Sequence, residues 1–154
     1  MLEDIKSYHL DDLKKLGMLN QFLTEIGNLD TNTTTTIFIF SSPQTIVDNE
    51  LARTTLTKIA ENGLLRVIAY DEIHLFEEFG RSFRPEFHKL GMFLKTINRE
   101  AICEILMTAT CTTKIKTSVE SMIGVKVQLT AWADEIEMKF RKVKVSVKNT
   151  SRQM

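Results

Sequence analysis

Two adjacent carboxylates, Asp71 and Glu72, follow an apolar run that covers residues 64–69. The run predicts a strand buried on both faces, as in parallel sheets, that delivers the carboxylates to the rim of the sheet. Ligands of open α/β sheets bind beyond such strand ends. One carboxylate can hold a water-coordinated Mg²⁺, and the next can orient a water that attacks a γ-phosphate. The pair therefore predicts a nucleotide site, with Asp71 on the metal side.

A second apolar strand ends in hydroxyls about thirty-five residues later. Residues 105–107 lead into Thr108 and Thr110, and His74 lies just after the carboxylate pair. Each group also has a plain structural explanation when taken alone. Two carboxylates after a strand can cap the next helix, a single histidine is most often a hydrogen-bonded structural residue, and a short threonine motif has little specificity.

The order of the predicted elements indicates one α/β domain with a mostly parallel sheet and flanking helices. Gly17 is a point at which the first helix can split, and Gly63 and Gly124 are predicted helix ends. The predicted strands cover residues 36–41, 64–71, 101–108, 125–131 and 143–147, with a weaker one at 5–10. The predicted helices cover residues 11–26, 45–62, 85–97 and 112–123.

The composition is that of an ordinary folded domain. Of the 154 residues 43% are hydrophobic, and Lys+Arg equals Asp+Glu at 20 each, so there is no overall basic footprint for nucleic acid. Cys103 and Cys111 lack metal-ligand spacing, and two thiols without a secretory leader indicate a reduced, intracellular protein. No run approaches the roughly 18 apolar residues of a membrane span, so no membrane partner is expected.

The stretch from Asp71 to Phe87 resembles the RecQ family of superfamily 2 helicases. Its Asp-Glu-x-His box is followed, without a gap, by an aromatic residue, a glycine and Phe-Arg-Pro-Glu-Phe, and Thr108-Ala109-Thr110 is similar to a later motif of that family. Three departures are specific. Ile73 stands where a small residue is usual, Phe79 where the family has Trp, and Glu77-Glu78 where the pair is usually uncharged.

The resemblance implies a role for each matching residue. Asp71, Glu72 and His74 would form the catalytic set with ATP and Mg²⁺, and Thr108 and Thr110 would couple hydrolysis to strand separation. Contacts to single-stranded or forked DNA would come from two segments, a strand end and an aromatic-rich loop. Their residues are Ser42, Pro43, Phe79, Arg81, Phe83 and Arg84.

Some of these DNA contacts have competing explanations. Ser42 and Pro43 also suit an ordinary strand-to-helix turn. Phe83 and Phe87 suit core packing as well as they suit DNA contact. Base stacking on an aromatic ring contributes about 1–3 kcal/mol, so Phe79 can partly replace Trp. The two extra carboxylates at residues 77 and 78 would repel a phosphate backbone.

A phosphate-binding loop is absent from these 154 residues. None of the six glycines is followed by Lys or has another Gly five residues later, so Gly-x-x-x-x-Gly-Lys-Ser/Thr does not occur. The family match covers about residues 5–148, which implies a partial ATP-binding domain, an incomplete RecA-like lobe, over residues 1–154. In this family the strand that leads into the phosphate-binding loop lies beside the strand that ends at Thr108. Its absence would leave an apolar edge on the sheet there.

The sequence is compatible with two classes of function. The chain is expected to be a fragment of a nuclear or otherwise intracellular RecQ-like DNA helicase, inactive as an ATPase without the missing helicase portions. The alternative is a non-catalytic nucleic-acid-binding or interaction module that keeps the lobe fold. The loop from Leu75 to Phe87 distinguishes them. An unrelated α/β nucleotide-binding protein would require both sequence boxes to be coincidences.

Overall fold

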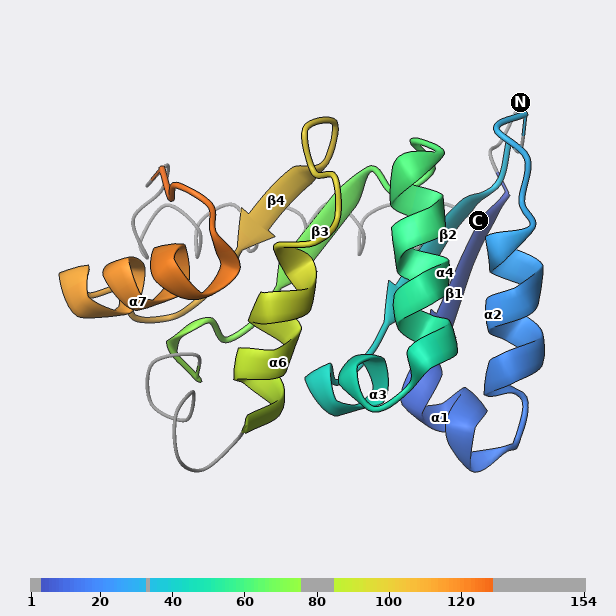
Figure 1. Ribbon diagram of the computed structural model, residues 1–154, viewed down its shortest axis with the longest axis horizontal. Helices are drawn as coiled ribbons and strands as arrows, with labels where there is room; N and C mark the ends of the chain where they lie inside the picture. The colour runs from blue at the N-terminus through green and yellow to red at the C-terminus, as the bar shows by residue number, and fades with distance from the viewer. Residues whose placement is uncertain (1–3, 33, 76–84, 129–154) are drawn as a thin grey trace, which may run out of the picture.

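The computed structural model describes residues 4–32, 34–75 and 85–128, which form a mixed α/β fold (Figure 1). This confirms the predicted fold class at the level of α/β architecture. None of the described helices is long and apolar enough to cross a membrane. The strands are β1 (Ile5–His9), β2 (Thr36–Phe40), β3 (Val67–Tyr70) and β4 (Cys103–Leu106). The helices are α1 (Leu10–Lys15), α2 (Leu19–Gly27), α3 (Pro43–Val47), α4 (Glu50–Glu61), α6 (Pro85–Leu94) and α7 (Thr113–Ile123).

The four strands form two parallel pairs. β1 pairs with β2, from Ile5 opposite Thr36 to His9 opposite Phe40. β3 pairs with β4 from Val67 opposite Cys103 to Tyr70 opposite Leu106. The parallel direction agrees with the sequence analysis. Within the described residues, however, each pair is a separate two-stranded sheet rather than part of one continuous sheet.

The expectation that the strand at residues 64–71 is buried on both faces is wrong for the described part of the chain. The strand is shorter, and Val67 is 50% exposed although Tyr70 is buried. β2 shows the same alternation, with Phe38 53% exposed between partly buried isoleucines. The physical reason is that the described helices cover one face of the strands, as Figure 1 shows for α2 and α4 over the first pair.

Local capping chemistry explains where the helices begin and end. Gly17 adopts φ +71° between α1 and α2, so the first predicted helix does split there. The prediction of one helix over residues 45–62 is wrong, because the Asn49 side chain accepts a hydrogen bond from the Ala52 amide at 2.9 Å and starts α4. Gly63 and Gly124 both take left-handed conformations after α4 and α7, as predicted.

The strand predicted at residues 125–131 does not form in its described part. Residues 125–128 are outside any strand, and the Val127 amide donates to the Glu120 carboxylate at 2.8 Å instead of to a neighbouring strand. Residues 129–131 and the strand predicted at 143–147 lie outside the described residues.

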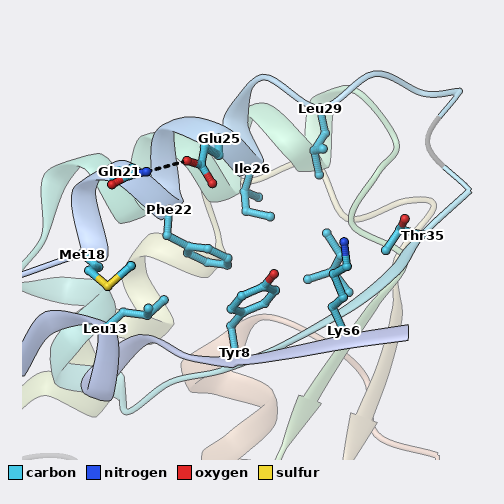
Figure 2. A pocket seen from close by; sticks show the side chains of 11 residues that line it. Lys6, Tyr8, Leu13, Met18, Gln21, Phe22, Glu25, Ile26, Leu29 and Thr35 are labelled. Atoms are coloured by element: carbon cyan, nitrogen blue, oxygen red, sulfur yellow. Dashed lines mark hydrogen bonds between the residues drawn. The ribbon is translucent and has the colours of Figure 1, made fainter. Parts of the chain in front are cut away.

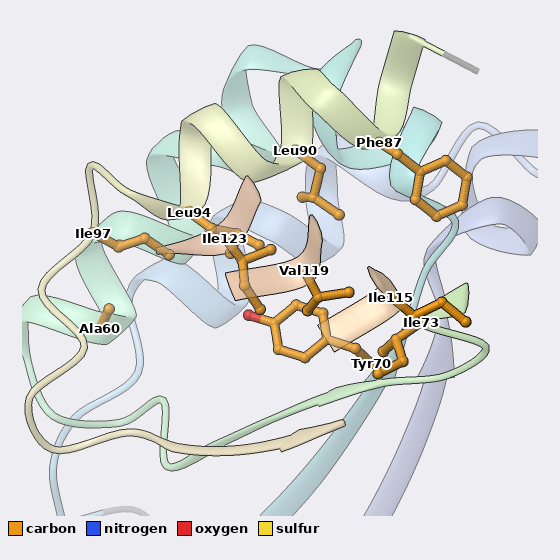
Figure 3. Close-up of a cluster of buried hydrophobic side chains, with 10 residues drawn as sticks. All are labelled: Ala60, Tyr70, Ile73, Phe87, Leu90, Leu94, Ile97, Ile115, Val119 and Ile123. Carbon is orange, nitrogen blue, oxygen red and sulfur yellow. The ribbon is translucent and has the colours of Figure 1, made fainter. Parts of the chain in front are cut away.

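The interior consists of two clusters of buried apolar side chains. One lies between β3, α6 and α7 and includes Tyr70, Phe87 and Val119 (Figure 3). The other joins α2 and α4 to β1 and β2 and includes Phe22 and Ala52. α3 packs against both α4 and α6 and thereby connects the two halves. Phe87 is only 6% exposed, so the core-packing explanation holds for this residue.

A glycine allows the closest approach between α6 and α7. A Cβ atom added at Gly91 would lie 2.7 Å from the Met122 carbonyl oxygen and 2.8 Å from its Cγ. The first of these atoms belongs to the backbone of α7 and cannot move without shifting the helix. Gly91 therefore sets the distance between the two helices that cover β3 and β4.

We expect Gly91→Ala to lower the free energy of unfolding by about 1–3 kcal/mol, because the methyl group must push α7 away from α6. Gly27→Ala is the matched control, since its added methyl would meet Thr55 at an ordinary 3.6 Å. That control should be neutral or stabilising by up to about 1 kcal/mol through helix propensity. Urea denaturation followed by circular dichroism measures both, and equal effects would contradict the tight contact.

Candidate functional site

Asp71 and Glu72 lie at the carboxyl end of β3, and both are exposed. A tight turn holds them there. The Asp71 Oδ1 atom accepts a hydrogen bond from the Glu72 amide at 2.9 Å, and the Glu72 carbonyl accepts one from the Leu75 amide at 2.9 Å. Glu72 has φ +53°, which makes it the one non-glycine residue with positive φ in the described part of the chain. Such a conformation is unfavourable for Glu and is typical of functional turns.

Backbone pairing between β3 and β4 continues beyond the two strands. The Met107 amide donates to the Tyr70 carbonyl at 2.8 Å, and the Ile73 amide donates to the Met107 carbonyl at 3.1 Å. The Ile73 side chain, only 2% exposed, enters the core below this turn. These contacts bring residues 72–74 beside residues 107–108, which are about thirty-five positions away in the sequence.

His74 joins the two strand ends through one ring nitrogen. Its Nδ1 atom lies 3.1 Å from Thr108 Oγ1 and 3.2 Å from Glu72 Oε2. The Thr108 hydroxyl donates its single proton to the Thr110 carbonyl at 2.9 Å, so Nδ1 must be the donor toward Thr108. We therefore assign the proton of neutral His74 to Nδ1. The Thr110 amide donates back to Thr108 Oγ1 at 3.3 Å.

The chemistry of this arrangement excludes a serine-hydrolase type of site. In such sites one histidine nitrogen contacts the nucleophile while the other contacts the carboxylate. Here the carboxylate of Glu72 and the hydroxyl of Thr108 both contact the same nitrogen of His74. The network instead links the carboxylates after β3 to the hydroxyls after β4. Of the predicted site residues, Glu72, His74, Thr108 and Thr110 are thus brought together, with Asp71 adjacent.

The carboxylates of Asp71 and Glu72 can serve only as part of the coordination shell of a Mg²⁺ ion. Among the described residues no group of three or more His, Cys, Asp or Glu side chains could hold a metal ion. Mg²⁺ usually keeps several waters and takes one or two protein carboxylates together with substrate phosphates. The exposed Asp71 suits such a site, which would take its other ligands from water and phosphate.

Ser42 and Pro43 lie between β2 and α3, where Pro43 is the first residue of the helix and Ser42 its N-cap. The Ser42 amide and hydroxyl donate to the Asp11 carboxylate at 2.8 and 2.6 Å, and the Thr45 hydroxyl donates to it at 2.8 Å. Asp11, in the first turn of α1, thus accepts hydrogen bonds from the start of α3. Its partners are more than thirty residues away, which local sequence rules cannot detect.

The remaining predicted DNA contacts stay predictions. Phe79, Arg81, Phe83 and Arg84 lie outside the described residues. The DNA-binding role of Ser42 and Pro43 also stays a prediction.

A second polar network, which the sequence analysis missed, supports β3 from the helix side. The Tyr70 hydroxyl donates to Glu104 Oε2 at 2.8 Å, and Arg99 forms an ion pair with Glu104 at 3.1 Å. Arg99 also donates to the carbonyl of Ile123, at the end of α7, at 2.7 Å. Burial and the neighbouring Glu104 carboxylate raise the pKa of Tyr70. In the sequence, the one indication of this network was Glu104, a charged residue in β4 on the face that the helices cover.

Comparison with known proteins relates a region of the chain to DNA helicases. ATP-dependent DNA helicase Q1 of Rattus norvegicus is 28% identical over 92 residues, which are 60% of this chain and 14% of that protein. The putative ATP-dependent DNA helicase Q1 of Caenorhabditis elegans is 26% identical over 92 residues, with the same coverage. The Mus musculus helicase Q1 is 29% identical over 72 residues, which are 47% of this chain and 11% of that protein.

These similarities are distant and partial. The matched regions span 11–14% of the length of these three relatives, and no family model matches the chain. They support a helicase-related region within the chain.

The positive φ of Glu72 predicts how substitutions at this position affect stability. Glycine adopts positive φ without steric cost, whereas Ala keeps the unfavourable contact between Cβ and the backbone. Both Glu72→Gly and Glu72→Ala remove the carboxylate. We expect the Gly variant to be more stable than the Ala variant by about 1 kcal/mol, after the larger unfolded-state entropy of glycine is subtracted. Thermal denaturation of the two variants checks this, and a more stable Ala variant would argue against the strained turn.

The Asp11 contacts predict a pH dependence of stability. Partial burial alone would raise the pKa of Asp11, but the hydrogen bonds from Ser42 and Thr45 outweigh it and lower the pKa below its usual value. A lowered carboxyl pKa stabilises the fold above the unfolded-state pKa of about 3.9, and this contribution is lost as pH falls through the folded-state pKa.

Asp11→Asn should therefore reduce the free energy of unfolding near neutral pH by about 1 kcal/mol, after allowance for solvent screening. The difference from the wild type should shrink as pH falls below the unfolded-state pKa of about 3.9, and should vanish below the lowered folded-state pKa, where the native carboxylate is protonated as well. Asp12→Asn is the control, because among the described residues its carboxylate pairs only with the exposed Lys15, at 3.0 Å. Urea titrations across this pH range would reject the assignment if the Asp11 and Asp12 variants behaved alike.

Proposed function

We propose that this chain is part of the ATP-binding lobe of a RecQ-like, ATP-dependent DNA helicase. The observation that carries the proposal is the hydrogen bond between His74 and Thr108, which joins the Asp-Glu-x-His turn to the Thr-Ala-Thr turn. Two motifs of the resemblance, separated in sequence, thus meet at neighbouring strand ends. The partial matches to helicase Q1 proteins support the same conclusion.

In this proposal each residue of the network has a separate task. Asp71 would hold Mg²⁺ through a bound water, and the metal would neutralise charge on the phosphates of ATP when it is bound. Glu72, fixed in its left-handed turn, would orient the attacking water. His74, with its proton on Nδ1, would connect Glu72 to Thr108 and so relate the state of the nucleotide site to the segment after β4.

In this proposal the chain forms an incomplete RecA-like lobe. This lobe works together with the other portions of the helicase. Its substrate would be single-stranded or forked DNA, contacted by the segment at Ser42 and by the loop that contains Phe79 and Arg84. Unwinding would depend on ATP hydrolysis, and the protein would work in the nucleus or elsewhere inside the cell.

The 154 residues alone should not hydrolyse ATP. They contain no phosphate-binding loop, so no lysine and no amide cradle hold the triphosphate against Asp71 and Glu72. We expect the purified chain to show no ATP turnover above that of Asp71→Ala, with or without single-stranded DNA. Turnover that Asp71→Ala abolishes would contradict this expectation.

A test of the proposed function itself requires the complete open reading frame. We would sequence the native transcript upstream of Met1 and express its complete open reading frame. An in-frame Gly-x-x-x-x-Gly-Lys-Ser/Thr segment should accompany DNA-stimulated ATPase activity that Asp71→Ala removes and that Asp12→Asn leaves unchanged. A complete protein that lacks this segment would overturn the helicase proposal and favour the interaction module.

A further inference from the structure

A cavity of about 270 Å³ lies between β1 and α2, far along the chain from the carboxylate turn (Figure 2). Its lining is mainly apolar and comes from β1, from β2 and from the segment between Leu13 and Leu29, with Tyr8, Phe22, Ile26 and Ile37 among the apolar residues. The Tyr8 ring packs on Phe22 with ring centroids 4.5 Å apart, which fixes the inner wall. This volume falls just below the usual range for small-molecule pockets and suits one large apolar side chain.

One edge of β1, the strand beside this cavity, has no strand partner among the described residues, because β1 pairs there only with β2. The Asp4 carbonyl accepts a hydrogen bond from the Thr36 amide at 2.9 Å. In a parallel ladder alternate residues face the partner strand, so Lys6 and Tyr8 direct their backbone groups toward β2. The backbone groups of Ile5, Ser7 and His9 therefore face outward and can pair with another extended chain.

The rim of the cavity carries a distinctive charge arrangement. The Lys6 side chain lines one side and forms an exposed ion pair with Asp4 at 3.2 Å. Exposed pairs of this kind are weak, so a carboxylate from a ligand can replace Asp4. On the other side the Gln21 amide donates to the Glu25 carboxylate at 2.9 Å. The apolar walls and the Glu25 carboxylate disfavour a nucleic-acid phosphate at this place.

We propose that the groove between β1 and α2 binds an extended peptide segment of a partner protein, which adds a strand to this edge of β1. Main-chain hydrogen bonds to Ile5, Ser7 and His9 give affinity, as in other strand-addition complexes. A large apolar side chain of the peptide fills the cavity beside Tyr8. Because Lys6 and Tyr8 are two residues apart on one face, an acidic residue two positions away in the peptide contacts Lys6.

This proposal goes beyond the helicase assignment and requires neither ATP nor DNA. The probe is a fluorescein-labelled octapeptide of alternating Thr and Val, with Glu and Leu placed two residues apart. Fluorescence anisotropy with the 154-residue chain should show saturable binding. The same peptide, N-methylated at the alternate amides of one edge, should bind at least about tenfold more weakly, because it cannot donate to the strand edge.

Two protein variants locate the binding site. Ser7→Pro removes an outward-facing amide without removing a bond to β2, and should weaken binding at least about tenfold. Lys6→Glu should weaken binding of the Glu peptide about threefold and favour a Lys-containing counterpart, whereas the control Lys89→Glu on α6 should leave both affinities unchanged. Circular dichroism confirms that each variant is folded, and the N-methylated peptide tests the wild-type protein independently.

Three outcomes would overturn the proposal. Absence of saturable binding by the octapeptide would overturn the proposal, as would equal binding of the N-methylated form. Displacement of the peptide by a labelled oligo-dT would also overturn it and identify the groove as a nucleic-acid surface.

Discussion

The parallel pairing of β3 with β4 is the constraint on which the candidate site depends. Its register places Tyr70 opposite Leu106, and the next backbone bonds extend the pairing to Met107 and Ile73. A slip of one residue would turn every side chain of one strand to the other face. His74 would then lose its neighbour Thr108, and Tyr70 would lose its contact with Glu104.

Two polar networks and one buried side chain specify this register. On the covered face, the Arg99–Glu104 pair is largely removed from solvent and needs all its partners, since removing one leaves an uncompensated charge. Tyr70 supplies one partner and the end of α7 supplies another. At the strand ends, the buried Ile73 fixes the turn that carries Glu72 and His74. The exposed site is thus positioned by interactions that lie below it.

Much of this arrangement could be predicted from the sequence because it follows from local rules. β-branched and apolar runs predicted β2 and β3, glycines predicted the ends of α4 and α7, and Pro85 predicted the start of α6. The roles expected for His74 and Thr108 followed only from the family resemblance. What could not be predicted depends on distant partners. Asp11 binds Ser42 across thirty-one positions, and the exposure of Val67 depends on which face the helices cover.

In the proposed site, the charge of the two carboxylates would oppose the binding of a nucleotide by these residues alone. Asp71 and Glu72 are exposed anions at one strand end, and a triphosphate that approaches them is anionic as well. Mg²⁺ offsets part of this repulsion, but one or two carboxylates hold it weakly unless phosphates complete its coordination. Lysine and backbone amides of a phosphate-binding loop would supply the missing attraction, and these 154 residues contain no such loop. If the proposed site is correct, the described residues would supply its metal-binding carboxylate and its link to the segment after β4, and the groups that hold the phosphates would have to come from elsewhere.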